Sequence, residues 1–168
     1  MEPPERLKET RKHITPLLNY TDIFAISTYP YMVRDGDPQR FDEIPKDWFE
    51  QVRSIAPGKP FAIAETGYIA EDLSAFFKTF TGTVKEQQQY VEWMLSEANR
   101  LDAQFVVWFV ITDYDDLWTV LKWVVLFNPL AKAWKDTGLY DGNLKPRPSL
   151  NSWDQWLKKP VKNKGQTL

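Results

Sequence analysis

The chain has 168 residues, of which 43% are hydrophobic and 26% charged, and this near-average composition excludes disordered and collagen-like classes. A net charge of −2 offers no basic field to nucleic acid phosphates, and no apolar run is long enough to span a membrane. The chain has no cysteine and one histidine, which excludes a disulfide framework and a thiolate or His-rich metal centre, and we expect no cofactor.

The length is that of one average domain and falls short of the roughly 250 residues of a complete (β/α)8 barrel. No internal repeat or Gly/Ser-rich linker divides the sequence, so we expect a single domain over 1–168 with a core over about 22–157. The N-terminal segment lacks the apolar stretch of a signal peptide. If the chain is a piece of a longer, secreted protein, the export signal would lie upstream, so the compartment stays open.

Helical and extended segments alternate from the N-terminus onward. The sequence predicts a helix over 6–19, followed by a strand over 22–27 that ends in an aromatic cluster. A second helix is predicted over 44–56, where large apolar side chains recur on one helical face. It leads into a run of small and apolar residues over 60–64 that stops at Glu65, the second predicted strand.

The second half of the chain repeats this order. After a stretch with a short helical pattern of its own, Thr83 and Glu86 have the spacing of a capping box and open a long helix that ends near Leu101. The apolar segment over 105–111 predicts a third strand, covered on both faces, and a last helix is expected over 150–157. This order predicts an α/β fold with three parallel strands, which fits both a barrel and an open doubly wound sheet.

Functional groups of βα proteins gather at the carboxyl ends of the strands. The candidates at these ends are Tyr29, Tyr31, Glu65, Trp108 and Asp113. Glu65 follows an apolar strand directly, in a low-dielectric setting where a charge needs a partner or water. The phenol of Tyr29 can donate a hydrogen bond to Glu65, and the indole face of Trp108 can stack on a sugar ring.

Each candidate also has an ordinary structural interpretation. Glu65 equally fits a surface loop in which it caps a helix or binds an arginine, and aromatic residues at strand ends often serve packing. The acids Asp113, Asp115 and Asp116 lack the spacing of a calcium loop, which favours solvated charge. A complete small α/β protein with an incidental Glu-Thr-Gly turn is a further alternative.

Four segments carry a family resemblance when they are taken in order: DIFAISTYPYM, KPFAIAETGY, FVVWFVITDYDDLW and GLYDGNLKPRPSLNSW. They resemble strands six, seven and eight and the end of the barrel in clan A retaining glycoside hydrolases. The resemblance covers about residues 22–156 and is nearest to arabinogalactan endo-β-1,4-galactanases, with cellulase-like barrels next. It implies a partial (β/α)8 TIM barrel from an enzyme that hydrolyses β-glycosidic bonds of plant-type polysaccharides or oligosaccharides.

The resemblance also implies roles for the candidates in a double displacement by two carboxylates about 5 Å apart. Glu65 matches the nucleophile, Tyr29 the residue that orients it, and Trp108 the floor of the sugar site. Further substrate contacts are expected from Tyr31, Tyr68 and Asp113. The family's acid/base belongs to an Asn-Glu pair on strand four, and the sequence contains no Asn-Glu, so we expect no activity from the chain alone.

A sheet that lacks five barrel strands has an edge with unpaired backbone groups. We therefore expect the chain to form a homo-oligomer or to pair with the missing N-terminal half of the barrel. The alternative function is a carbohydrate-binding or self-associating half-barrel module without catalysis. In each case the expected ligand is a carbohydrate, with no nucleic acid and no membrane.

Overall fold

The computed structural model describes residues 4–32, 40–75, 78–125 and 134–160. Within them the α-helices are α1 (Pro4–Ile14), α2 (Trp48–Arg53), α3 (Val84–Arg100), α4 (Asp115–Val125) and α5 (Pro148–Leu157). The strands are β1 (Phe24–Thr28), β2 (Phe61–Thr66), β3 (Leu73–Ala75), β4 (Lys78–Phe80) and β5 (Val106–Trp108). Short 3-10 helices are η1 (Thr15–Tyr20), η2 (Pro30–Met32) and η3 (Phe41–Glu43).

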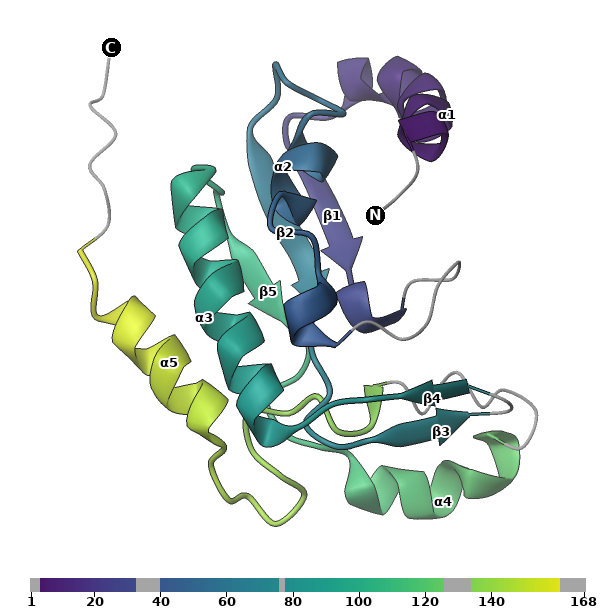
Figure 1. The fold of residues 1–168 in the computed structure, drawn as a ribbon, viewed down its shortest axis with the longest axis vertical. Coiled ribbons are helices and arrows are strands. Elements are labelled where there is room, and N and C mark those ends of the chain that lie inside the picture. Colours follow the sequence, from purple (N-terminus) through teal and green to yellow (C-terminus); the bar gives the residue numbers. More distant parts are fainter. Residues whose placement is uncertain (1–3, 33–39, 76–77, 126–133, 161–168) are drawn as a thin grey trace.

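A parallel sheet with the order β1–β2–β5 organises the chain, and β2 lies in its middle. Helix-containing crossovers join the strands, which confirms the predicted α/β fold with three parallel strands, consistent with part of a (β/α)8 barrel. Helices α3 and α5 lie side by side along the sheet, and the β3–β4 ribbon and α4 lie beyond the carboxyl ends of the strands (Figure 1). None of the described helices is long and apolar enough to cross a membrane.

The core fills the space between the sheet and its helices. Phe61 and Ile63 of β2 share one buried cluster with Phe49 of α2 and with Tyr90 and Met94 of α3. Each of these side chains is almost completely buried. Burial of an apolar side chain of this size contributes about 1.5–3 kcal/mol, so the cluster holds the helices on this face of the sheet.

Helix α3 begins where the capping box predicts. The hydroxyl of Thr83 accepts the Glu86 backbone N–H at 3.1 Å and donates to the Glu86 carboxylate at 2.9 Å. This satisfies a backbone donor that the first turn of a helix leaves without an internal partner. The start of the long helix is therefore confirmed.

Other parts of the prediction are wrong. The stretch before α3 is the antiparallel ribbon β3–β4 rather than a short helix, because Leu73 and Phe80 pair across it and are both buried. The strand predicted over 105–111 shortens to β5, and one face of it is open: Phe105 and Val107 are 43% and 47% exposed. Helix α1 stops as an α-helix just before Pro16, which has no N–H to donate.

An extra residue near the end of β2 decides which side chains face the core. Against β1, Ile26 pairs with Ile63 but Ser27 pairs with Glu65, so Ala64 has no register partner. The pairing with β5 shifts over the same stretch. Because side chains alternate along a strand, Ile63 and Glu65 would otherwise share the core face. This β-bulge turns Glu65 to the opposite face.

Thr66 takes the buried position that Glu65 leaves. Its hydroxyl donates to the Thr28 carbonyl at 2.8 Å and lies 2.6 Å from the Tyr90 hydroxyl. The Thr28 hydroxyl in turn accepts the Trp48 indole N–H at 3.0 Å. These bonds tie the end of β2 to α2 and α3. Because they hold Thr66 in the core, they also fix the direction of its neighbour Glu65.

Candidate functional site

Glu65 and Tyr29 meet at the carboxyl end of the sheet. Tyr29 follows β1 and donates its hydroxyl hydrogen to Glu65 Oε1 over 2.5 Å, and both side chains are half-buried. The hydrogen bond predicted between these two residues is therefore present. Burial, followed by the hydrogen bond to Glu65 and its charge, raises the pKa of Tyr29 above its ordinary value. The phenol accordingly keeps its proton at neutral pH and stays a donor to the carboxylate.

The Tyr29 ring is held on several sides. The rings of Tyr31 and Trp134 meet it edge to face, with centroid distances of 6.1 and 5.9 Å. The backbone of Gly67 passes close beneath: a Cβ there would lie 3.1 Å from Tyr29 Cε1 and 2.6 Å from the Phe109 carbonyl oxygen. Only a residue without a side chain allows this approach, so Gly67 helps to set where the phenol lies.

The face of the sheet that carries Glu65 is open along its outer strands, β1 and β5, while Ala62 of the middle strand is buried. Ser27, its register partner on β1, is exposed, and so is Ala25 on the same strand. On the other side of β2, the exposed Phe105 and Val107 alternate with Val106, which packs against the core. A polymer or another protein segment can therefore reach this face.

The structure places Trp108 on the helix side of the sheet. It pairs in register with Thr66, and its ring meets Tyr90 and Trp153 at centroid distances of 6.1 and 6.2 Å. Its indole N–H donates to the Thr137 carbonyl at 3.0 Å. The structure thus brings Tyr29 to the carboxylate but not Trp108, whose sugar-stacking role stays a prediction.

Tyr31 and Tyr68 form an aromatic support behind the site. Both are completely buried, their ring centroids lie 5.3 Å apart, and Tyr68 stacks on Tyr90 at 5.2 Å. Burial raises the pKa of both phenols. Neither side chain has exposed surface, and their predicted contacts with substrate stay predictions.

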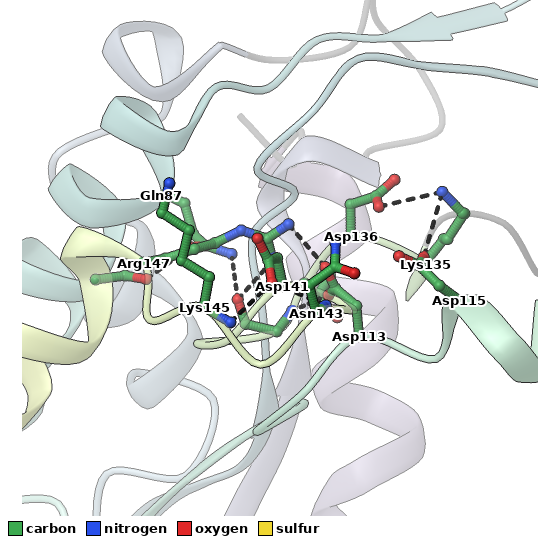
Figure 2. A network of polar contacts seen from close by, with 12 residues as sticks. Gln87, Asp113, Asp115, Lys135, Asp136, Asp141, Asn143, Lys145 and Arg147 are labelled. Carbon is green, nitrogen blue, oxygen red and sulfur yellow. Dashed lines mark hydrogen bonds and ion pairs between the residues drawn. The ribbon is translucent and has the colours of Figure 1, made fainter.

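Asp113 lies in a buried ion pair with Arg147 (Figure 2). Its Oδ2 is 2.7 Å from Arg147 Nη2, its Oδ1 accepts the Gly138 N–H at 2.7 Å, and the two side chains are 1% and 7% exposed. Arg147 also donates to the Gly138 carbonyl at 2.8 Å. Burial raises the pKa of Asp113, while the bonds from Arg147 and Gly138 act against this rise. Both carboxylate oxygens are engaged within the chain, and the predicted contact with substrate stays a prediction.

Gln87 extends this network to the helices (Figure 2). Its side-chain nitrogen donates to the carbonyls of Tyr68 and Gly138 at 3.0 and 3.2 Å, and its oxygen accepts the Ser149 hydroxyl at 2.6 Å. The contacts tie the first turns of α3 and α5 to the segment that follows β2 and to the segment between α4 and α5. Gln87 of α3 thus helps to hold these connecting segments in place.

The other acids predicted near β5 lie in a separate pairing. Lys135 bridges Asp115 and Asp136 at 3.5 and 3.4 Å, and Asp116 is exposed in the first turn of α4 (Figure 2 shows the bridge). In the part of the chain that the structure describes, no group of three or more His, Cys, Asp or Glu side chains is arranged to hold a metal ion.

No family model and no curated protein sequence matches the chain. An active-site mutant of the Rhizomucor miehei β-1,3-glucanosyltransferase, in complex with laminaritriose, matches 85% of it with a TM-score of 0.50 and 14% identity. The Faecalibacterium prausnitzii β-glucuronidase matches 84% of the chain with a TM-score of 0.56 and 17% identity. The Eisenbergiella tayi β-galacturonidase matches 90% of the chain with a TM-score of 0.56 and 16% identity.

The fold is glycoside hydrolase-like. The transferase is a family 17 and the galacturonidase a family 2 glycoside hydrolase. At these identities the likeness shows the fold alone and does not reach the arabinogalactan endo-β-1,4-galactanase type that the sequence resembles. The chain spans 54% of the transferase, 22% of the glucuronidase and 26% of the galacturonidase.

Three features of the site were not predicted from the sequence. The bulge at Ala64 has no local signal, because small and apolar residues fit a regular strand equally well. Gly67 is part of the Glu-Thr-Gly segment, but the Tyr29 ring that it approaches belongs to the segment after β1, which is distant in sequence. Trp134 has the helical spacing of a core residue and reaches Tyr29 only through the fold.

We predict that Gly67→Ala lowers the free energy of unfolding by about 1–3 kcal/mol, because the added methyl overlaps the Phe109 carbonyl and presses on the Tyr29 ring. Urea unfolding measures the change. Gly58→Ala is the matched control, since a Cβ there meets nothing within 4 Å. Equal stability of the two variants would contradict the close approach.

We predict that Arg147→Met lowers the free energy of unfolding by about 3–5 kcal/mol, because it leaves the buried Asp113 carboxylate without its cation. Urea unfolding across pH tests this. The hydrogen bond and charge of Arg147 lower the pKa of Asp113 in the wild type, so in Arg147→Met the folded carboxyl takes up a proton at a higher pH than in the wild type, and the deficit shrinks as the pH falls.

The control for this ion pair is Arg100→Met, which breaks a solvent-exposed contact with Glu97 and is expected to change stability little. Adding Asp113→Asn to Arg147→Met is expected to restore part of the loss. A deficit in Arg147→Met that is as small as that of the control, or that grows as the pH falls, would contradict the assignment.

Proposed function

We propose that this chain carries the nucleophile side of a retaining β-glycoside hydrolase site, with Glu65 as the nucleophile. The observation that carries the proposal is the 2.5 Å hydrogen bond from Tyr29 to Glu65 at the carboxyl end of the middle strand. Double displacement needs an ionised carboxylate held in one direction. The neutral phenol of Tyr29 stabilises the charge on one oxygen and leaves the other to attack the anomeric carbon.

The proposed substrate is a β-linked polysaccharide or oligosaccharide. The sequence resemblance favours β-1,4-linked galactans or glucans of plant type, and the Rhizomucor miehei neighbour was determined with laminaritriose. The open face beside Glu65 suits a chain-like ligand better than a closed pocket would. The two uronidase neighbours make a β-uronide the competing substrate class.

The chain supplies one carboxylate of the pair in this proposal. The acid/base of the resembled family belongs to an Asn-Glu segment, and the sequence has none. Without a general acid the rate on a natural glycoside falls by about 10² to 10⁴. The nucleophile is therefore best tested with a substrate whose leaving group needs no proton.

We predict that dinitrophenyl 2-deoxy-2-fluoro-β-glycosides label Glu65 covalently. The carboxylate oxygen bonds to C1, the C1–O bond breaks, and dinitrophenolate leaves with the electron pair. Because the acid/base that would activate water is absent, the glycosyl ester accumulates and appears as one added sugar by intact mass spectrometry. Galactosyl, glucosyl and glucuronyl reagents compared in parallel report the substrate class.

Glu65→Gln is expected to abolish the label. Tyr29→Phe is expected to slow labelling about tenfold or more, because it removes a hydrogen bond to a charged group. Asp116→Asn is the control carboxylate, since this side chain is exposed in the first turn of α4. Labelling of other carboxylates, or none with any reagent, would contradict the proposed nucleophile.

A second candidate function is a self-associating half-barrel module. The observation that favours it is the exposed apolar face at Phe105 and Val107, together with β1 and β5 as the outer strands of the sheet. We propose that additional βα units cover this face in a complete assembly, and that a second copy of the chain covers it when the chain is alone. Such burial would remove apolar surface and satisfy edge strands.

We predict that the purified chain elutes as a dimer or larger species in size-exclusion chromatography with light scattering. The double change Phe105→Lys and Val107→Lys is expected to return it toward a monomer by charging the apolar face. Val84→Lys, an exposed position on α3, is the control and leaves the mass unchanged. A stable wild-type monomer at high concentration would contradict self-association, and glycan binding that survives Glu65→Gln would favour a binding module over catalysis.

A further inference from the structure

Trp134 contacts the Tyr29 ring, and the proposed function does not yet include it. Its ring plane stands at 88° to the Tyr29 ring, and the centroids lie 5.9 Å apart. It comes from the segment between α4 and α5, whereas Tyr29 follows β1. Two distant parts of the chain thus meet at the phenol that donates to Glu65.

The phenol oxygen has capacity for a second partner. A tyrosine hydroxyl has one hydrogen to donate, which Tyr29 gives to Glu65, and its oxygen still has lone pairs to accept one. An indole N–H is a donor without acceptor capacity, so it matches this remaining position. The contact with Trp134 lowers the pKa of Tyr29, the direction expected of a donor to the phenol oxygen, against the larger rise caused by burial and Glu65.

Trp134 is itself held by its neighbours. Its carbonyl accepts the Thr137 hydroxyl at 3.0 Å, and the Thr137 carbonyl accepts the Trp108 indole N–H at 3.0 Å. Thr137 is completely buried. The backbone of Trp134 is therefore tied to the end of β5, and its side chain packs against the core cluster.

We propose that Trp134 is a positioning residue for the nucleophile: its indole N–H donates to the Tyr29 hydroxyl, which commits the phenolic hydrogen to Glu65. The inference rests on the proposed function for its catalytic meaning. Consecutive hydrogen bonds polarise one another, so donation from Trp134 strengthens the bond from Tyr29 to the carboxylate. The pair of bonds also stops the hydroxyl from rotating toward another acceptor.

The hydrogen bond is tested without any activity, by NMR of the Trp134 indole N–H. Its signal is assigned as the one lost in Trp134→Phe. In Tyr29→Phe, which keeps the ring and removes the acceptor, we expect this N–H to exchange with solvent at least about fivefold faster. The other indole signals, including that of Trp156 beside Lys159, serve as internal controls and should not change. An unchanged Trp134 signal overturns the inference.

If Tyr29→Phe does not fold, a ring-fluorinated tyrosine at the same position keeps the shape and weakens the oxygen as an acceptor. It is expected to accelerate indole exchange in the same direction. An indole that does not respond to this change overturns the inference as well.

The positioning role is tested by a double-mutant cycle on the labelling rate of Glu65. Trp134→Phe alone is expected to slow labelling about threefold to tenfold, and Trp156→Phe to leave it unchanged. In the Tyr29→Phe background, Trp134→Phe should have no further effect, because it acts through the phenol. Equal slowing in both backgrounds would indicate packing alone and overturn the positioning role.

The two proposals fail in different ways. Absence of labelling in the wild-type chain counts against Glu65 as nucleophile, while the indole measurement still decides whether Trp134 binds Tyr29. Labelling that proceeds at the wild-type rate in Trp134→Phe leaves the nucleophile standing and removes Trp134 from its positioning.

Discussion

The step in register at Ala64 determines what the end of the middle strand can present. A regular strand would place the carboxylate of Glu65 on the core face next to Tyr90, where an unpaired charge is costly. With the extra residue, Thr66 occupies that place and satisfies its hydroxyl with two hydrogen bonds. Glu65 then emerges on the open face beside Tyr29. One extra residue in β2 therefore lets Thr66 pack in the core while the Glu65 carboxylate lies on the opposite face.

The surroundings make this arrangement rigid on one side and accessible on the other. Behind the sheet, stacked tyrosines and the buried pair of Asp113 and Arg147 fix the loops at the carboxyl ends of the strands. In front, Phe105 and Val107 remain exposed. The chain spans about half or less of the glycoside hydrolase structures that it matches. The buried support and the exposed face fit the proposal that this chain provides one carboxylate, Glu65, and that another part of the site provides its partner.

Sequence patterns predicted the parts of the structure that depend on local periodicity and on strand ends. The parallel strands, the start of α3 at Thr83 and the meeting of Tyr29 with Glu65 follow from these patterns, because adjacent parallel strands end at the same edge. The face on which Trp108 lies could not be predicted, since a shift of one residue moves a side chain to the other side of the sheet.

Contacts between residues that are distant in the sequence could not be predicted either. Asp113 finds Arg147 and Tyr29 finds Trp134 only after distant segments come together, and neither spacing resembles a motif. Complete burial of an aromatic residue depends in the same way on what the rest of the chain places over it. The fold as a whole decides contacts of this kind, and local sequence patterns do not predict them.

Nuclear Overhauser contacts at the end of β2 decide whether the bulge points Glu65 away from the core. With the bulge in place, we expect contacts between the Glu65 side chain and the Tyr29 ring, and between the Thr66 side chain and the Tyr90 ring. Contacts between Glu65 and the Tyr90 ring, with Thr66 facing solvent, would show a regular strand and rule out the bulge that turns Glu65 away from the core.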